Sequence, residues 1–400
     1  MNVFAGPDFY HQLGHNDQNR CLSLLKDGKG AGAILSPRNI KREDKLHEFA
    51  VEYKSTATEL IIDPQLYSSF HLNPQEDASQ LENTSAWADP NVGTPILKDA
   101  LQRQQGLEPS KYLVPAPFAS SITESWLTTV RNFVNGALEW QYVNNITHDL
   151  YSTIAISVNV LEDETARLQL LNAISGFSVR GFYLISDMPS RATNPQALYG
   201  MLDLVFRLKR NGFNLLLGYT EPWAVLVFPF GLEGFASSGQ KNRRVFHQGQ
   251  WRGQQKSGGS APKYFDFWSL DLLDSIRFPT DADALVRSGL WKKLYSASPH
   301  AVIFEERGPK EVFKNRQWTL RDSFDNYSVM MCQLSAKYRH LDYSARLDAV
   351  RSMVSNAQAM QSQLAKHGVE LRGDRKQFNI WLETLDRYIT SNRDQIMDEF

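Results

Sequence analysis

The sequence has few cysteines, no excess of one charge and no export signal. Its 400 residues include 2 cysteines, Cys21 and Cys332, too few for a disulfide framework or a four-cysteine zinc site. Lys and Arg number 43 and Asp and Glu number 44, so the net charge of -1 gives no global attraction to nucleic acid or membrane. The first residues have neither the basic nor the apolar part of a signal peptide. We therefore expect a cytoplasmic protein without a metal site.

Long uninterrupted apolar runs and glycine-rich nucleotide fingerprints are also missing. The most apolar stretch, 215–232, contains Glu221, Pro222 and Pro229, which indicates a buried strand, a turn and a short buried helix. No Rossmann or P-loop pattern occurs, and no G-x-S-x-G elbow surrounds Ser237. We expect neither a membrane partner nor a cofactor.

Short apolar runs alternate with longer amphipathic stretches between about residues 30 and 240, which is typical of βα units on a parallel sheet. The runs are AGAILS (31–36), TELIID (58–63), KYLVPA (111–116), STIAISVNV (152–160), VRGFYLIS (179–186), NLLLGY (214–219) and GLEGFASSG (231–239). Their number is too large for a flavodoxin-like sheet. They predict an α/β fold of the TIM-like (β/α)₈ barrel class, with a doubly wound open sheet as the alternative.

The same pattern divides the chain into two parts. It predicts the barrel over residues 1–275, with a polar insertion at 68–110 that is rich in Asn, Asp and Pro. Residues 276–400 are expected to form a C-terminal helical domain, because apolar residues recur there at helical spacing. That domain is a candidate surface for a protein partner or for a second copy of the chain.

Polar residues collect where the predicted strands end, which is the active-site face of a parallel barrel. Asp63 follows an apolar run and is interpreted as a general acid or base, or as the cap of an Asx-turn before Pro64. Asp187 allows a similar choice between a catalytic group and the start of a loop. The candidate catalytic residues are Asp63, Asp187 and Glu221, and the candidate substrate contacts are Arg38, Gln65, Asn159, Ser186 and Tyr219. Arg38 is interpreted either as a phosphate clamp or as the partner of an acid such as Asp63.

One window of 32 residues, from Gly234 to Phe265, has no acidic residue. Cations with interspersed aromatic and glycine residues suit a phosphodiester backbone with a stacked base, and loops near the last strands of barrels commonly bind phosphate. A solvated loop is the other interpretation. The candidate phosphate contacts are Lys241, Arg243, Arg244, Arg252, Lys256 and Lys263.

Several of these segments, in the same order, resemble the tRNA-guanine transglycosylase barrel. STIAISVNV with the following DETARLQLLNAIS resembles the family's strand ending in Gln-Gly-Gly and its next helix. GFSVRGFYLIS resembles the segment that contacts the deazaguanine base, and NLLLGYTEPWAVLVFPFGLEGFASSGQKNRR resembles the last strands and their basic loop. LIIDPQ resembles the strand that ends in the family's catalytic-site Asp. The resemblance covers about half of the chain.

The resemblance implies roles for some residues of this sequence, whereas other residues of the family's motifs are absent from it. Asp63 would contact the base or act as acid and base, Asn159 and Ser186 would line the pocket, and Lys241, Arg243 and Arg244 would contact the nucleic-acid backbone. The position of the family's nucleophilic Asp is Ala236, its neighbouring Cys is Ser237, and the zinc motif is absent. Covalent glycosyl exchange by the family mechanism therefore lacks its nucleophile.

Three hypotheses follow from these residues. The first is base exchange or glycosidic-bond chemistry on a nucleoside in DNA or RNA, as in members of the group that modify DNA with 7-deazaguanine. The second is a catalytically inactive barrel that binds nucleic acid or a modified base as a sensor or complex subunit. The third is a barrel hydrolase with paired carboxylates, such as Asp63 with Asp187 or Glu221.

Overall fold

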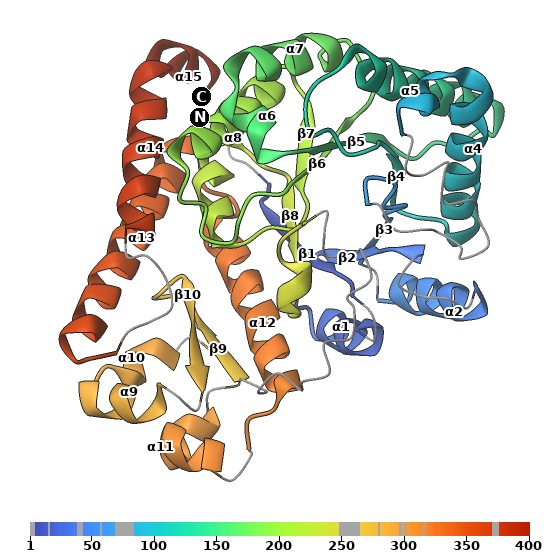
Figure 1. The fold of residues 1–400 in the computed structure, drawn as a ribbon. Coiled ribbons are helices and arrows are strands. Elements are labelled where there is room, and N and C mark those ends of the chain that lie inside the picture. The colour runs from blue at the N-terminus through green and yellow to red at the C-terminus, as the bar shows by residue number, and fades with distance from the viewer. Residues whose placement is uncertain are drawn as a thin grey trace.

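Eight parallel strands form a closed barrel in chain order, and β1 closes the ring by pairing with both β2 and β8 (Figure 1). The computed structural model describes residues 5–14, 17–37, 43–56, 58–68, 84–247, 265–278, 281–295, 298, 300, 302–314, 317–369 and 376–400. The strands are β1 (Asp8–Gln12), β2 (Gly32–Leu35), β3 (Glu59–Ile62), β4 (Lys111–Val114), β5 (Leu150–Ile156), β6 (Gly181–Ser186), β7 (Asn214–Leu217) and β8 (Gly234–Ser237). The predicted TIM-like barrel is confirmed, and the open sheet is not formed.

Helices follow the strands and cover the outside of the barrel. They are α1 (Gln18–Lys26), α2 (Glu43–Lys54), the 3-10 helix η2 (Thr84–Ala88), α4 (Pro90–Leu107), α5 (Glu124–Val143), α6 (Val158–Glu162), α7 (Glu164–Ile174), α8 (Pro195–Arg210) and the 3-10 helices η3 (Pro222–Phe230) and η4 (Lys241–Arg243). Side-chain caps at Thr123, Asp163 and Asn194 accept backbone N–H groups at the starts of α5, α7 and α8. The stretch 215–232 forms β7 and the buried η3, as predicted.

Each predicted apolar run contains a strand, but β1 is an eighth strand that the pattern did not indicate. Its sequence, DFYHQ, places polar side chains in buried positions. Gln12 accepts a hydrogen bond from Tyr183 inside the barrel, at 3.0 Å, and His11 lies 2.6 Å from the Lys29 carbonyl oxygen. A strand whose buried residues are polar has no alternation of apolar and polar residues, which explains why the prediction missed it.

The segment expected as an insertion, 68–110, contains the helix that joins β3 to β4. Within it, α4 starts at the cap Asp89, which accepts the Asn91 N–H at 2.9 Å. Leu97 and Leu101, one turn apart, are buried, and α4 packs against α5. In the described part of this segment, polar residues lie on the exposed face of α4, so its second half is part of the barrel rather than an addition.

The chain leaves the barrel through an antiparallel hairpin of β9 (Phe265–Ser269) and β10 (Asp274–Phe278). The boundary expected after residue 275 therefore falls inside β10. The helices beyond it are α9 (Ala282–Ser288), α10 (Trp291–Tyr295), α11 (Val302–Lys314), α12 (Leu320–Tyr338), α13 (Tyr343–Lys366), α14 (Gln377–Ser391) and α15 (Arg393–Glu399). In the ranges that the structure describes, no helix is long and apolar enough to cross a membrane.

The C-terminal region has two cores. The hairpin and α9 to α11 share a small core around Phe267, Phe304 and Trp318, whereas α12 to α15 continue the main core of the barrel. Tyr388 of α14, for example, packs edge-on against Phe230, with ring centroids 5.6 Å apart. Helices α12 to α14 therefore lie directly against the barrel, and strand β9 of the hairpin packs against α12 (Figure 1).

The N-terminal end of the barrel is closed by an ionic cluster. The Lys111 ammonium group lies 2.8 Å from the carboxylates of both Glu59 and Glu233, and the Tyr151 hydroxyl donates to Glu233 at 2.6 Å. Burial alone would lower the pKa of Lys111, but Glu233 and Glu59 raise it above its ordinary value. Glu233 thus lies at the end of the barrel opposite the active-site face.

Replacing Lys111 by Met should lower the free energy of unfolding by about 2 kcal/mol, because two partly buried carboxylates would face each other without a cation. Urea unfolding at pH 7 measures the change. Lys54→Met is the matched control: Lys54 pairs with the exposed Glu108, and its loss should cost less than about 1 kcal/mol. Equal losses in both variants would contradict a structural role for the Lys111 cluster.

Candidate functional site

Buried polar and aromatic side chains fill the C-terminal end of the barrel. We refer to six of them, each 3% exposed or less, as the mouth cluster: Gln12, Asp63, Gln65, Tyr67, Tyr183 and Tyr219. They come from strands β1 and β6 and from the turns that follow β3 and β7. The C-terminal end of a parallel barrel is where the loops build an active site. The mouth cluster therefore occupies the expected functional position.

Asp63 is the centre of this cluster. One of its carboxylate oxygens accepts the Gln65 backbone N–H at 2.9 Å, and the other accepts the Tyr67 hydroxyl at 2.5 Å. The first bond is the Asx-turn that one interpretation of the sequence expected. In the second bond, Tyr67 is the donor and holds the carboxylate in place. Burial and the nearby Asp63 raise the pKa of Tyr67 well above its usual value, so its hydroxyl group keeps its proton.

Two residues of the cluster have a backbone conformation that side chains disfavour. Gln65 and Tyr219 both have φ of 54°, in the left-handed region. Their side chains meet, since the Gln65 amide donates to the Tyr219 hydroxyl at 2.7 Å. Conformations of this kind cost on the order of 1 kcal/mol each and occur often at functional sites. Gly218 adds a close approach: a Cβ there would lie 2.4 Å from the Tyr183 hydroxyl.

Hydrogen-bonding capacity is left over inside the cluster. Among the described residues, the amide nitrogen Nε2 of Gln12 and the amide oxygen Oε1 of Gln65 are buried without a partner. Phe246, fully buried, lies beside them, with its ring centroid 5.3 Å from Tyr67, 5.4 Å from Phe118 and 5.8 Å from Tyr219. An aromatic ring thus already occupies the space between the tyrosines.

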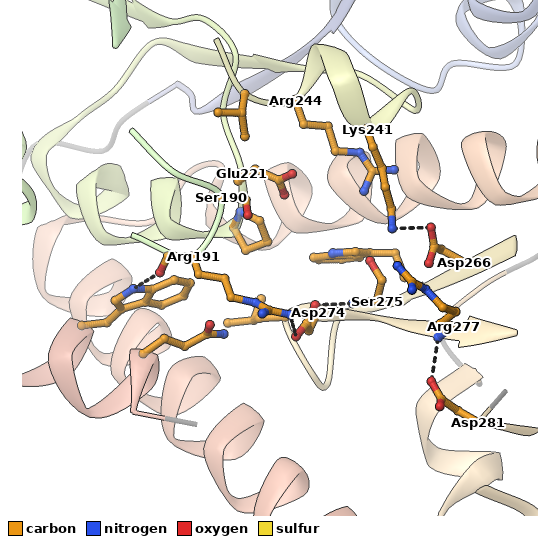
Figure 2. Close-up of a pocket in the computed structure, with 16 residues that line it drawn as sticks. Ser190, Arg191, Glu221, Lys241, Arg244, Asp266, Asp274, Ser275, Arg277 and Asp281 are labelled. Carbon is orange, nitrogen blue, oxygen red and sulfur yellow. Dashed lines mark hydrogen bonds and ion pairs between the residues drawn. The ribbon is translucent and has the colours of Figure 1, made fainter. Parts of the chain in front are cut away.

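A second hollow lies beside the mouth, between the strand ends, the β9–β10 hairpin and the start of α14 (Figure 2). Its volume is about 400 Å³. We call it the charged pocket, and its lining residues are Ser190, Arg191, Glu221, Pro222, Lys241, Arg244, Val245, Asp266, Trp268, Leu273, Asp274, Ser275, Arg277, Asp281, Gln377 and Trp381. Residues from the barrel, the hairpin and α14 meet here, so the fold as a whole forms this pocket.

Most cations of the charged pocket already have partners. Lys241 lies 2.5 Å from an Asp266 carboxylate oxygen, and Arg191 lies 3.5 Å from Asp274. Arg244 donates to the backbone carbonyls of residues 238 and 239, at 2.8 and 2.7 Å, and its guanidinium carbon lies 3.4 Å from the centre of the Tyr327 ring. These contacts position the segment after β8 and give each of these three cations an acceptor or an aromatic partner within the protein.

Two carboxyl groups of the pocket titrate near neutrality. Burial raises the pKa of Glu221 to about 7, although the nearby Arg244 opposes the rise. Burial likewise raises the pKa of Asp274 to about 6, against the effect of Arg191. Figure 2 shows the Glu221 carboxyl group facing Arg244 and Lys241. Acidic groups with such pKa values are often found in functional sites.

The predicted site residues divide between these two places and a third. Asp63, Gln65 and Tyr219 belong to the mouth cluster, whereas Glu221, Lys241 and Arg244 line the charged pocket. Asp187 accepts the Val158 N–H at the start of α6, at 2.5 Å. Ser186 accepts the Met188 N–H, and Asn159 is exposed on α6. The three predicted carboxylates thus lie in three different surroundings and do not converge on one site.

The other predicted basic residues are either buried or outside the described residues. Arg243 is buried, and burial lowers its pKa although the Tyr219 and Tyr67 hydroxyl groups lie near enough to raise it. Arg38, Arg252, Lys256 and Lys263 lie outside the described residues. In the parts of the chain that the structure describes, no group of three or more His, Cys, Asp or Glu residues is arranged to hold a metal ion.

Sequence reasoning missed several residues of both places. Tyr67 follows Asp63 by four positions, and that spacing could have placed it beside the carboxylate. Phe246 lies within the acid-free window, but only the cations of that window were predicted as binding residues. Asp274 and Gln377 give no local signal, because only the tertiary fold brings the hairpin and α14 to the strand ends.

No protein-family model and no curated protein matches the chain. The barrel fold alone is compatible with many chemistries. The function must therefore be argued from the side chains of the mouth cluster and the charged pocket.

Replacing Glu221 by Gln should stabilise the protein more at pH 8 than at pH 5. The pKa of Glu221 is about 7 in the folded protein and near the ordinary 4.5 when unfolded, so its contribution to stability falls as the pH rises between these values. Gln cannot ionise and avoids that loss. Urea unfolding of both proteins at each pH measures the difference. A stability difference that does not change with pH would disprove this assignment, and Glu164→Gln on the exposed side of α7 is the control.

Proposed function

We propose that the barrel acts on a nucleoside within DNA or RNA, binding its base at the mouth cluster for base exchange or glycosidic-bond cleavage. Two lines of support lead to this proposal. The resemblance to the transglycosylase barrel suggests the reaction, and the mouth cluster suggests the ligand. A base needs flat aromatic surfaces for stacking and polar groups for its edge. The cluster supplies tyrosine rings together with one unpaired amide donor and one unpaired amide acceptor.

The observation that carries the proposal is the position of Phe246. Its ring contacts Tyr67, Tyr219 and Phe118 within the barrel mouth, where a flat heterocycle would make the same contacts. Unlike a base, phenylalanine leaves the Gln12 and Gln65 amide atoms without partners. A base that displaces Phe246 would keep the aromatic contacts and add hydrogen bonds to both amides. That exchange favours a ligand with a polar edge.

Asp63 is the proposed acid and base. Its carboxylate already accepts a hydrogen bond from Tyr67, and it lies in the same cluster as the groups that would contact the base. In cleavage, water attacks the sugar carbon and the bond to the base breaks; in exchange, the incoming base attacks instead. Asp63 can take the proton that the attacking group loses and give it to the leaving base. Tyr67 acts through Asp63 as a positioning residue, since its bond fixes the orientation of the carboxylate.

The segment that carries Phe246 also connects the mouth to the basic residues. Lys241 is half exposed at its start, and Arg252, Lys256 and Lys263 follow it in the sequence. We expect cations in this part of the sequence to neutralise phosphates of a nucleic-acid strand whose base enters the mouth. Arg243 and Arg244 are both buried, so we assign them to holding the segment rather than to binding phosphate.

Binding without catalysis is the second candidate, and a specific observation favours it. The positions that the resemblance matches to the nucleophile and its neighbour are Ala236 and Ser237. The Ser237 hydroxyl donates to the Thr220 carbonyl oxygen at 2.6 Å and lies 2.8 Å from the Tyr327 hydroxyl. Because its proton is engaged and no base is bonded to it, Ser237 is poorly placed to replace the missing carboxylate.

Replacing Phe246 by Ala should increase affinity for a base several-fold, because the ligand no longer has to displace a buried ring. Fluorescence of a single-stranded oligonucleotide that contains 2-aminopurine measures both binding and stacking of the base. Phe230→Ala, which opens space in the core outside the mouth, controls for loosening of the barrel. Weaker binding by Phe246→Ala than by the wild-type protein would count against base binding at the mouth.

Replacing Asp63 by Asn separates the enzyme from the sensor. If Asp63 is the acid and base, release or exchange of a base from an oligonucleotide should fall by 10²-fold or more, in line with the usual contribution of such groups. Binding should change much less. Chromatography of released bases follows the reaction, and unchanged turnover in the variant would eliminate the proposed role of Asp63.

Oligonucleotide binding should also weaken steeply with salt. Removing two charges with Arg252→Gln and Lys256→Gln together should reduce the slope of log K against log salt by about two. The control removes two exposed charges, Lys292 and Lys314, from α10 and α11. An equal effect in both double variants would show that the acid-free window has no special part in binding.

A further inference from the structure

Two acceptors that line the charged pocket have no hydrogen-bond partner among the residues that the structure describes. Glu221 forms no hydrogen bond or ion pair through its carboxyl group among the described residues, although it faces the pocket. Gln377, the first residue of α14, is 3% exposed, and its side-chain oxygen is buried without a partner. Two acceptors from distant parts of the chain thus line one hollow. A buried acceptor without a partner destabilises the protein, so a ligand that donates hydrogen bonds to both acceptors would be bound favourably.

We propose that the charged pocket binds a small organic cation, of the amine or guanidine class, through the Glu221 carboxylate and the Gln377 side-chain oxygen. This site is separate from the mouth cluster and does not depend on base binding there. Its volume of about 400 Å³ is sufficient for a compact ligand. Trp268 and Trp381, both buried, also line it and provide aromatic surface, which favours organic cations.

An anion would suit the pocket less well, despite its arginine and lysine residues. Lys241 is paired with Asp266, and Arg191 lies beside Asp274. Arg244 is bound to two backbone carbonyls and to the Tyr327 ring. An anion would have to compete with these contacts, and it would also approach Glu221. The Glu221 carboxyl group and the Gln377 side-chain oxygen instead favour a ligand that donates hydrogen bonds.

The charges around Glu221 come from each element packed against it. Arg191 follows β6, Lys241 and Arg244 follow β8, and Asp274 lies on β10. Asp266, Arg277 and Asp281 line the more distant part of the hollow. Since burial raises the pKa of Glu221 to about 7, a cation that needs its carboxylate should bind more weakly as the pH falls below 7. The affinity should decrease by up to about tenfold for each pH unit.

Isothermal titration of the full chain with agmatine, which has an amine and a guanidine group, tests the proposal. We expect binding at pH 8 and roughly tenfold weaker binding at pH 6. Glu221→Gln, which removes the charge and keeps the shape, should weaken binding at pH 8 at least tenfold. Gln377→Met, which removes the second acceptor, should weaken it several-fold. Glu164→Gln is the matched control and should bind as the wild-type protein does.

Lys241→Met separates a cation site from an anion site. It should leave agmatine binding unchanged or make it tighter, because it removes a positive charge from the lining. Titration with inorganic phosphate tests for an anion site. Absence of agmatine binding to the wild-type protein, agmatine binding that survives Glu221→Gln, or phosphate binding that Lys241→Met abolishes would each overturn the proposal. Melting curves of every variant identify any that fail to fold, and either acceptor variant alone suffices for the test.

Discussion

One buried guanidinium group holds the last third of the chain on the barrel. Arg346 of α13 is completely buried, and its side chain donates to the carbonyl oxygens of Gly6, Phe228 and Leu341. These acceptors belong to the segment before β1, to η3 and to the turn before α13. Burial lowers the pKa of Arg346 to about 10, so it remains charged at neutral pH and needs all of its acceptors. Because α13 is held in this way, α14 and the hairpin lie over the strand ends, where they complete the charged pocket.

The repeating part of the fold was predictable because it depends on local pattern. Each apolar run between residues 30 and 240 contains a barrel strand, and the C-terminal helices follow the spacing of their apolar residues. The periodic pattern of apolar residues does not predict an element whose buried side chains are polar. Strand β1 has His11 and Gln12 in buried positions, and α4 displays a polar face that resembles an insertion. In both cases the buried contacts of the element come from residues far away in the sequence, which a local pattern does not contain.

The candidate site was predictable to a smaller extent. Position after a strand identified Asp63, Gln65 and Tyr219 at the mouth and Glu221 at the pocket, since parallel strands all end on one face. It did not separate the two groups, because the direction of a side chain after a strand depends on turn geometry. Tyr219 has left-handed backbone and points into the barrel, whereas Glu221, two residues later, faces outward. Gln377 comes from the last helices, and only packing brings it to the strand ends.

The pairing of β1 with β8 also determines the order in which this chain can fold during synthesis. Strand β1 leaves the ribosome first, yet one of its neighbours, β8, emerges only after the rest of the barrel. Helix α12, which packs against β1, is made later still. Until then, an edge of the growing sheet has unpaired N–H and C=O groups, the kind of surface that promotes association between chains. Of the eight barrel strands, β1 must therefore wait longest for one of its native partners, and its exposed edge is a site where nascent chains can associate.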